Sequence, residues 1–157
     1  MEHYKDSLKV SARAEEVFAY IDDHTRFSSH MSRSSWMMGG GNMTTLLDEG
    51  RGKTVGSHIR MKGKVFGFNL YLDEIVTLRQ PPHSKVWKTV GDLRLLVMGH
   101  YQMQIDIIPQ DNASWISVSI DYELPEKNAW LGKLFGGWYA KWCVHQMLRD
   151  VKHHFSF

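Results

Sequence analysis

Between residues 43 and 125 the chain consists of short strand-like segments, several of which alternate apolar and polar residues with a period of two, and this pattern limits the fold more than any other feature. The clearest examples are 100–108 and 115–124, where every second residue is apolar. Turn-forming pairs and glycines, such as Asp111-Asn112, separate the alternating segments. Strands that follow one another through short turns form an antiparallel sheet with one apolar and one polar face.

A first strand is also expected before this region, at 4–10. The strands predicted along the whole chain are 4–10, 44–49, 55–64, 66–78, 86–90, 100–108 and 115–124.

Helical spacing of apolar residues appears on both sides of the alternating region. Residues 12–22 predict a short helix with Ser11 as its N-cap, and 24–31 predict a second short helix. Pro125 ends the sheet, and the proline-free segment that follows predicts a long amphipathic helix at about 137–153.

These elements predict an α+β fold in one domain, residues 1–157. A sheet of about seven strands with one apolar face must bury that face, and one long helix laid across its concave side does so. A strongly curved sheet and a single helix do not touch everywhere, so we expect an apolar, ligand-sized cavity between them.

Composition excludes several other classes. The formal net charge is only +2 with the two signs interspersed, which disfavours nucleic acid as a partner. The single cysteine, Cys143, allows no disulfide within the chain and fits a reducing compartment, and we expect a cytoplasmic protein without a membrane-spanning segment. Nine Met and six Trp suit either a soft core or the lining of an apolar pocket.

Three segments resemble those of a known superfamily. Residues 9–23 resemble its first strand and first helix, with Arg13 where the family commonly has proline. Residues 74–87, with Pro81-Pro82 at their turn, resemble the strand-turn-strand of its polyketide-cyclase-like branch, and 138–143 resemble the last helix of a bacterial subgroup. The chain is thus similar to the START and birch-pollen-allergen (SRPBCC) superfamily over its whole length.

The resemblance implies the helix-grip fold: a curved antiparallel sheet wrapped around a long C-terminal helix, with two short helices after the first strand. It also implies a small hydrophobic ligand, such as a lipid, a polyketide or another cyclic or aromatic molecule. The alternative is an enzyme of the polyketide cyclase/dehydratase type, and a third reading is an interaction module whose cavity is filled by its own side chains. No cofactor is expected, and a homodimer stays open.

Strand parity and the last helix predict which side chains line the cavity, and Phe27 and Met31 are expected at its entrance near the glycines of 39–41. The expected ligand-binding residues are Phe27, Met31, Met61, Phe68, Leu70, Tyr101, Met103, Val118, Trp138 and Trp142.

Glu74 is a weak catalytic candidate because it shares the parity of the apolar residues around it. Burial would raise its pKa and suit it to proton transfer. The favoured alternative places Glu74 at the cavity rim, paired with Arg60 or Lys62. Tyr101 has two readings as well, a hydrogen bond to ligand or, more commonly, one to backbone.

Other motifs predict no site. Residues 52–54 resemble the end of a phosphate-binding loop, but position 47 is Leu where that loop needs Gly, so a hairpin is the better interpretation. The nine histidines show no metal-ligand spacing, and no metal is expected.

Overall fold

The computed structural model describes residues 1–23, 42–65, 68–95, 97–127 and 129–155. Its strands are β1 (Glu2–Val10), β2 (Asn42–Leu47), β3 (His58–Val65), β4 (Phe68–Gln80), β5 (Ser84–Thr89), β6 (Tyr101–Gln110) and β7 (Ala113–Tyr122). Its helices are α1 (Ala14–Ile21), α4 (Ala129–Leu131), the π-helix η2 (Gly132–Gly136) and α5 (Gly137–His154).

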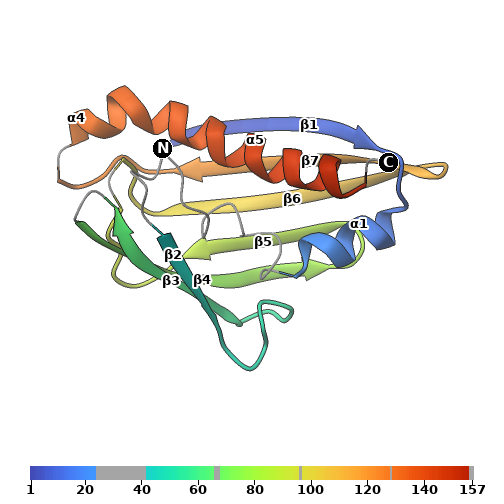
Figure 1. Cartoon of the computed structure of the whole chain (residues 1–157), viewed down its shortest axis with the longest axis horizontal. Helices are drawn as coiled ribbons and strands as arrows, with labels where there is room; N and C mark the ends of the chain where they lie inside the picture. Colours follow the sequence, from blue (N-terminus) through green and yellow to red (C-terminus); the bar gives the residue numbers. More distant parts are fainter. Residues whose placement is uncertain (24–41, 66–67, 96, 128, 156–157) are drawn as a thin grey trace.

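The seven strands form one antiparallel sheet in the order β1-β7-β6-β5-β4-β3-β2. Six of them form a meander, and β1 is added beside β7, so that Glu2 lies opposite Tyr122 and Val10 opposite Ser114. Figure 1 shows the sheet curving away from β1 and β7 toward β2 and β3, with α5 lying along β1 and β7. The predicted antiparallel sheet with a long C-terminal helix is confirmed.

Alternation along the strands produces the buried face. On β4, residues 70, 72, 74 and 76 are buried, and on β7 residues 116, 118, 120 and 122 are buried. In the register of the sheet Met103 lies opposite Ile120, and Ile105 opposite Val118, so that the apolar side chains of neighbouring strands form continuous rows. The parity predicted for these strands is confirmed.

The helix α5 buries one side against the sheet, and that side consists of Ala140, Cys143, Val144, Met147, Leu148 and Val151. The preceding η2 lies close to the backbone at Val97 and to Pro125. A Cβ on Gly132 would lie 2.5 Å from Pro125 Cδ, and one on Gly136 would lie 3.0 Å from the Val97 carbonyl oxygen. The two glycines let the helical segment pass close to Val97 and Pro125 without a clash.

The first helix begins later than the sequence indicates. Its N-cap is Arg13, without a side-chain capping bond, so the prediction of Ser11 as N-cap is wrong. The Ser114 hydroxyl donates to the Ala12 carbonyl at 2.8 Å, which holds the segment before Arg13 against β7. The predicted helix at 24–31 lies outside the described residues.

Candidate functional site

The buried face of the sheet contains one carboxylate among apolar side chains, that of Glu74. It lies on β4 between Leu72 and Val76 and is 3% exposed. The Tyr101 hydroxyl, from β6, donates a hydrogen bond to Glu74 Oε2 at 2.5 Å. Thr89 of β5 is the strand neighbour of Glu74, and its hydroxyl accepts the Tyr101 backbone N–H at 3.0 Å. Three adjacent strands therefore place Glu74, Thr89 and Tyr101 in one row.

Burial is the main influence on the Glu74 carboxyl. It raises the pKa of Glu74 from 4.5 to about 7, and the nearby Asp73 adds to the increase. Hydrogen bonds from Tyr101 and Trp87, together with the Lys85 charge, act in the opposite direction. Glu74 therefore changes its charge close to neutral pH, as an acid–base group must.

The helix α5 adds two polar side chains, Tyr139 and Cys143, which are hydrogen-bonded to each other. Burial raises the pKa of the Cys143 thiol to about 12, and the Glu74 charge acts in the same direction. Burial also raises the pKa of Tyr101 well above its usual value, and Glu74 and Cys143 contribute. We call Glu74, Trp87, Tyr101, Tyr139 and Cys143 the interior polar cluster, and all but Glu74 stay neutral near pH 7.

Two expectations about this cluster are corrected. Glu74 is not at an exposed rim beside Arg60 or Lys62, because Arg60 instead contacts Asp73 at 3.4 Å on the other face of β4. The Tyr101 hydroxyl bonds a side chain rather than backbone. Both differences follow from register, which sets Tyr101 across β5 from Glu74. Parity does predict that Glu74 points inward.

The residues predicted to line the cavity have different environments. Met61, Leu70, Met103 and Val118 are buried on the interior face. Tyr101 is partly buried and packs against the core. Phe27 and Met31 lie outside the described residues, as do the glycines at 39–41.

Phe68 and the two tryptophans differ from the rest. Phe68 begins β4 at the end of the sheet and is 60% exposed. Trp138 is 49% exposed because it precedes Ala140 by two positions and so lies on the opposite side of α5. Trp142 is half-buried and stacks on Tyr139 with ring centroids 5.7 Å apart. Trp142 therefore contacts the interior polar cluster, whereas Phe68 and Trp138 face solvent.

The alternating pattern did not predict a buried ionic group at the other end of the interior face. Lys85 of β5 is fully buried, and its Nζ donates to Asp22 Oδ1 at 2.8 Å and to the Gly52 carbonyl at 2.6 Å. Arg79 Nη2 donates to Asp22 Oδ2 at 2.8 Å. Burial opposes the charge of Asp22, but its bonds to Arg79 and Lys85 prevail and lower the pKa of Asp22. We call Asp22, Arg79 and Lys85 the ionic triad.

The loop at 50–53 is a hairpin turn, as the sequence favours. Asp48 Oδ1 accepts the Gly50 N–H at 3.0 Å and the Ser57 hydroxyl at 2.6 Å. The Gly52 N–H donates to Ser57 Oγ at 2.7 Å, and Gly52 takes a positive φ of 73°. These internal bonds use the amides that a phosphate-binding loop would offer to its ligand.

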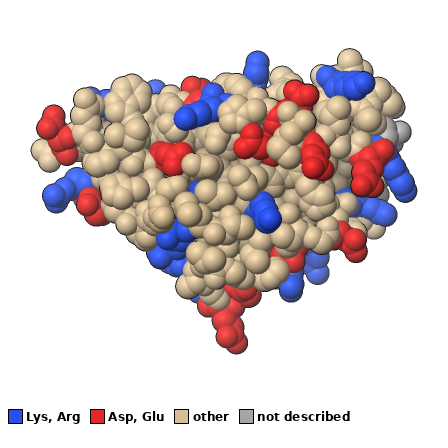
Figure 2. Space-filling model, turned by 180° about the vertical axis from the view of Figure 1, so that it is seen from behind, with Lys and Arg blue, Asp and Glu red and all other residues tan. Residues whose placement is uncertain are grey.

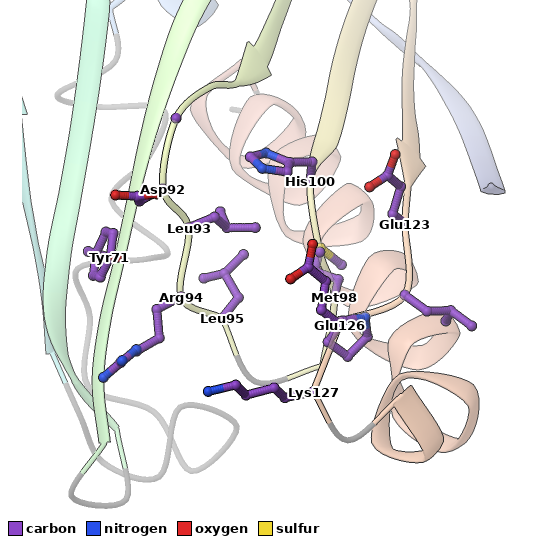
Figure 3. Close-up of a pocket in the computed structure, with 14 residues that line it drawn as sticks. Tyr71, Asp92, Leu93, Arg94, Leu95, Met98, His100, Glu123, Glu126 and Lys127 are labelled. Atoms are coloured by element: carbon purple, nitrogen blue, oxygen red, sulfur yellow. The ribbon is translucent and has the colours of Figure 1, made fainter.

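Two hollows open near residues 91–95. One, of about 340 Å³, is shown in Figure 3: Leu93, Leu95 and Met98 come from the segment between β5 and β6, and Glu126 and Lys127 from the segment before α4. Charged groups of both signs line it. The other, of about 390 Å³, has mostly apolar walls and includes Met61. Among the described residues of the predicted lining, Met61 alone borders either hollow.

The face opposite to that of Figure 1 shows basic and acidic side chains intermixed (Figure 2). Within the described ranges, histidine, cysteine and carboxylate side chains do not gather into a group of three that would hold a metal ion. Among those same residues, none of the helices has the length and apolar content to span a bilayer.

Comparisons with solved structures show the fold. A truncated norcoclaurine synthase from Thalictrum flavum superposes with a TM-score of 0.68 at 14% identity, covering 96% of this chain and 91% of that one. The major latex-like protein 151 of Panax ginseng gives 0.61 at 14% identity, with 98% and 97% covered. Ara h 8.0201 gives 0.63 at 9% identity, with 96% and 97% covered.

No curated protein sequence matches the chain. The family model described as "Polyketide cyclase / dehydrase and lipid transport" matches residues 1–155, nearly the whole length. The helix-grip fold and the superfamily resemblance are thereby confirmed, and the chain belongs to the polyketide cyclase/dehydrase and lipid transport family.

Proposed function

We propose that this protein binds and carries a small hydrophobic molecule, a lipid, a polyketide or another cyclic or aromatic compound, between the concave face of the sheet and α5. The observation that supports this most is the interior face itself. Met61, Leu70, Leu72, Met103 and Val118 present apolar surface from four strands, and the ionisable groups described there belong to the interior polar cluster and the ionic triad. The family's description, which names lipid transport, supports the same class of ligand.

Such a lining binds mainly by removing apolar surface from water. Each Å² of apolar ligand surface covered contributes about 25 cal/mol, without any need for directional contacts. Methionine side chains adapt to ligands of different shape, and Met61 and Met103 lie on strands on either side of β4 and β5. The binding energy therefore depends on the size of the apolar ligand more than on its exact outline.

A charge placed on the interior face tests the location of the site. Met103→Arg puts a long cation at mid-face, and we expect it to abolish binding of an uncharged apolar probe such as fluorene. Binding is measured by quenching of tryptophan fluorescence and by the rise in melting temperature that mass action produces.

Gln102→Arg is the matched control, because it adds the same cation one position earlier on the opposite face of β6. Circular dichroism establishes that both variants fold. Unchanged binding by a folded Met103→Arg protein would place the site elsewhere.

A second function is an enzyme of the polyketide cyclase/dehydratase type, and Glu74 is the observation that favours it. A carboxyl whose pKa lies at about 7 is suited to take or give a proton at neutral pH. We expect an enzyme to convert a poly-β-ketone substrate to a cyclised product, and Glu74→Gln to stop the conversion while the substrate still binds. A carrier binds the same molecule and releases it unchanged. An interaction module filled by its own side chains yields no ligand in a native mass spectrum and binds no apolar probe.

A further inference from the structure

The position of the interior polar cluster suggests which hydrophobic ligands the protein selects. We propose that Glu74 and Tyr101 bind a carbonyl oxygen at the buried end of the ligand, so that ketones, quinones and esters are preferred over hydrocarbons of the same shape. This inference rests on the proposed ligand-binding function and narrows it to carbonyl compounds.

The argument begins with a count of donors and acceptors. Tyr101 donates to Glu74 Oε2, and the Trp87 indole, which can only donate, bonds to the same carboxyl. An ionised carboxylate accepts both hydrogens, and the three side chains are then satisfied. A neutral Glu74 adds one more hydrogen.

That additional hydrogen has one acceptor among the three side chains, the Tyr101 phenol oxygen. In one arrangement the carboxyl donates to the Tyr101 oxygen, and the Tyr101 hydrogen needs another acceptor. In the other arrangement Tyr101 donates to the carboxyl, and the carboxyl hydrogen needs another acceptor. The neighbouring Thr89 hydroxyl is already bonded to the His100 ring and the Tyr101 backbone. Within these three side chains one O–H donor is therefore in excess when Glu74 is neutral, and the Tyr139 hydroxyl donates its own hydrogen to Cys143. An acceptor oxygen on a ligand would satisfy the excess donor, because a buried donor without an acceptor is costly.

The surroundings favour the neutral form of Glu74. Asp73, on its own strand, opposes ionisation, while Lys85 on β5 favours it from the ionic triad, where its Nζ is already bonded to Asp22. The groups facing Glu74 from β6 and α5, which are Tyr101, Tyr139 and Cys143, are uncharged near pH 7. On β3, its neighbour is the apolar Ile59. With the pKa of Glu74 at about 7, the donor is present at and below neutral pH.

Fluorene and 9-fluorenone test the inference, since the two tricyclic molecules share a shape and differ by one carbonyl. Their affinities are measured by isothermal titration calorimetry at about pH 5.5 and about pH 8.5. For the wild-type chain we expect the ketone to bind about tenfold more tightly at the lower pH, and the preference to shrink at the higher pH as Glu74 ionises.

Two variants separate recognition from packing. Glu74→Gln keeps an oxygen to accept from Tyr101 and an N–H to donate, and it does not titrate, so the ketone preference should persist at both pH values. Glu74→Leu combined with Tyr101→Phe removes both O–H groups of the proposed carbonyl site and should bind both molecules equally. Glu123→Gln, an exposed carboxylate just after β7, is the control and should behave as wild type.

The outcomes are distinguishable. Equal affinities of wild type for the two molecules at about pH 5.5 would keep the proposed function and overturn the carbonyl inference. A ketone preference that survives in the Glu74→Leu/Tyr101→Phe variant would overturn it as well. Tighter binding of 9-fluorenol than of 9-fluorenone at that pH would mean that the carboxyl acts as an acceptor, and would also overturn it. Binding of neither molecule would count against the proposed function itself. The wild-type comparison needs no variant to fold.

Discussion

Glu74 illustrates, at the scale of a single residue, how strand position determines side-chain chemistry. Its inward direction follows from the alternation of residues 70–76, which the sequence displays. The identity of its hydrogen-bond partner does not follow from the alternation, because Tyr101 is 27 residues away in the chain and reaches Glu74 only across β5. A periodic pattern predicts which face a residue occupies, whereas the hydrogen bonds between strands depend on a register that the pattern leaves open.

The elevated pKa of Glu74 links stability to pH. Because the pKa is raised from 4.5 to about 7 on folding, the folded state holds its proton more firmly, and the stabilisation is fully present below pH 4.5 and is lost as the pH rises through about 7. The loss amounts to about 3 kcal/mol. We expect the difference in unfolding free energy between wild type and Glu74→Gln to shift by this amount, in favour of the variant, from about pH 4.5 to about pH 8.5.

Urea denaturation at a series of pH values measures this difference, and the exposed Glu123→Gln variant supplies the baseline. A difference between wild type and Glu74→Gln that stays constant across this range would show that Glu74 titrates alike in the folded and unfolded chain.

At the scale of elements, the ionic triad joins three parts of the chain that are distant in sequence. Asp22 follows α1, Arg79 is near the end of β4, and Lys85 is on β5 and also bonds the turn at Gly52. The register between β4 and β5 shifts between Val76 and Leu78, which brings Arg79 opposite Lys85. A bulge of this kind reverses parity partway along a strand, so the simple alternation did not predict the triad.

Removing one member of the triad should leave a buried charge without its partner. Asp22→Asn is expected to lower the unfolding free energy by about 3 kcal/mol, because Lys85 then retains a cation in the interior without a counter-ion. The double variant Asp22→Asn/Lys85→Met should recover part of that loss. Equilibrium urea denaturation gives both values, with Lys88→Met, an exposed position on the same strand, expected to change stability by about 0.5 kcal/mol or less.

If Asp22→Asn and Lys88→Met lower the unfolding free energy by the same amount, the triad contributes no more to stability than a surface charge does. The single variant Lys85→Met completes the cycle. A double variant whose loss equals the sum of the Asp22→Asn and Lys85→Met losses would likewise show that the two charges act independently.

For the whole molecule, the sequence predicts the architecture better than the detail. Alternation up to Pro125 followed by helical spacing establishes the sheet and the helix across it, because both periods are imposed by burial of one face. The π-helical segment at 132–136 is not indicated by the helical spacing, because it depends on how closely the chain packs there. The exposed positions of Phe68 and Trp138 were not predicted either. Phe68 begins β4 at the end of the sheet, and Trp138 lies on the side of α5 that faces away from the sheet.

The fold as a whole should depend on α5. Ending the chain at Gly137 removes Ala140, Val144, Met147 and the rest of the helical face that packs on β1 and β7. The apolar face that includes Val118 and Ile120 would then face water, and a large exposed apolar patch on a sheet leads to association. We expect the truncated chain to aggregate in size-exclusion chromatography and to lack a cooperative thermal transition.

A single substitution tests the same dependence without shortening the chain. Met147→Asp places an unpaired carboxylate against the sheet and is expected to lower the unfolding free energy by about 3–5 kcal/mol. Arg149→Asp introduces the same side chain on the exposed side of α5 and should leave the free energy within about 1 kcal/mol of wild type. A soluble truncated chain that melts cooperatively, or two aspartate variants of equal stability, would mean that the sheet folds without support from α5. The ligand site would then have to be formed by the strands alone, since the Cys143 and Tyr139 side of the interior polar cluster belongs to that helix.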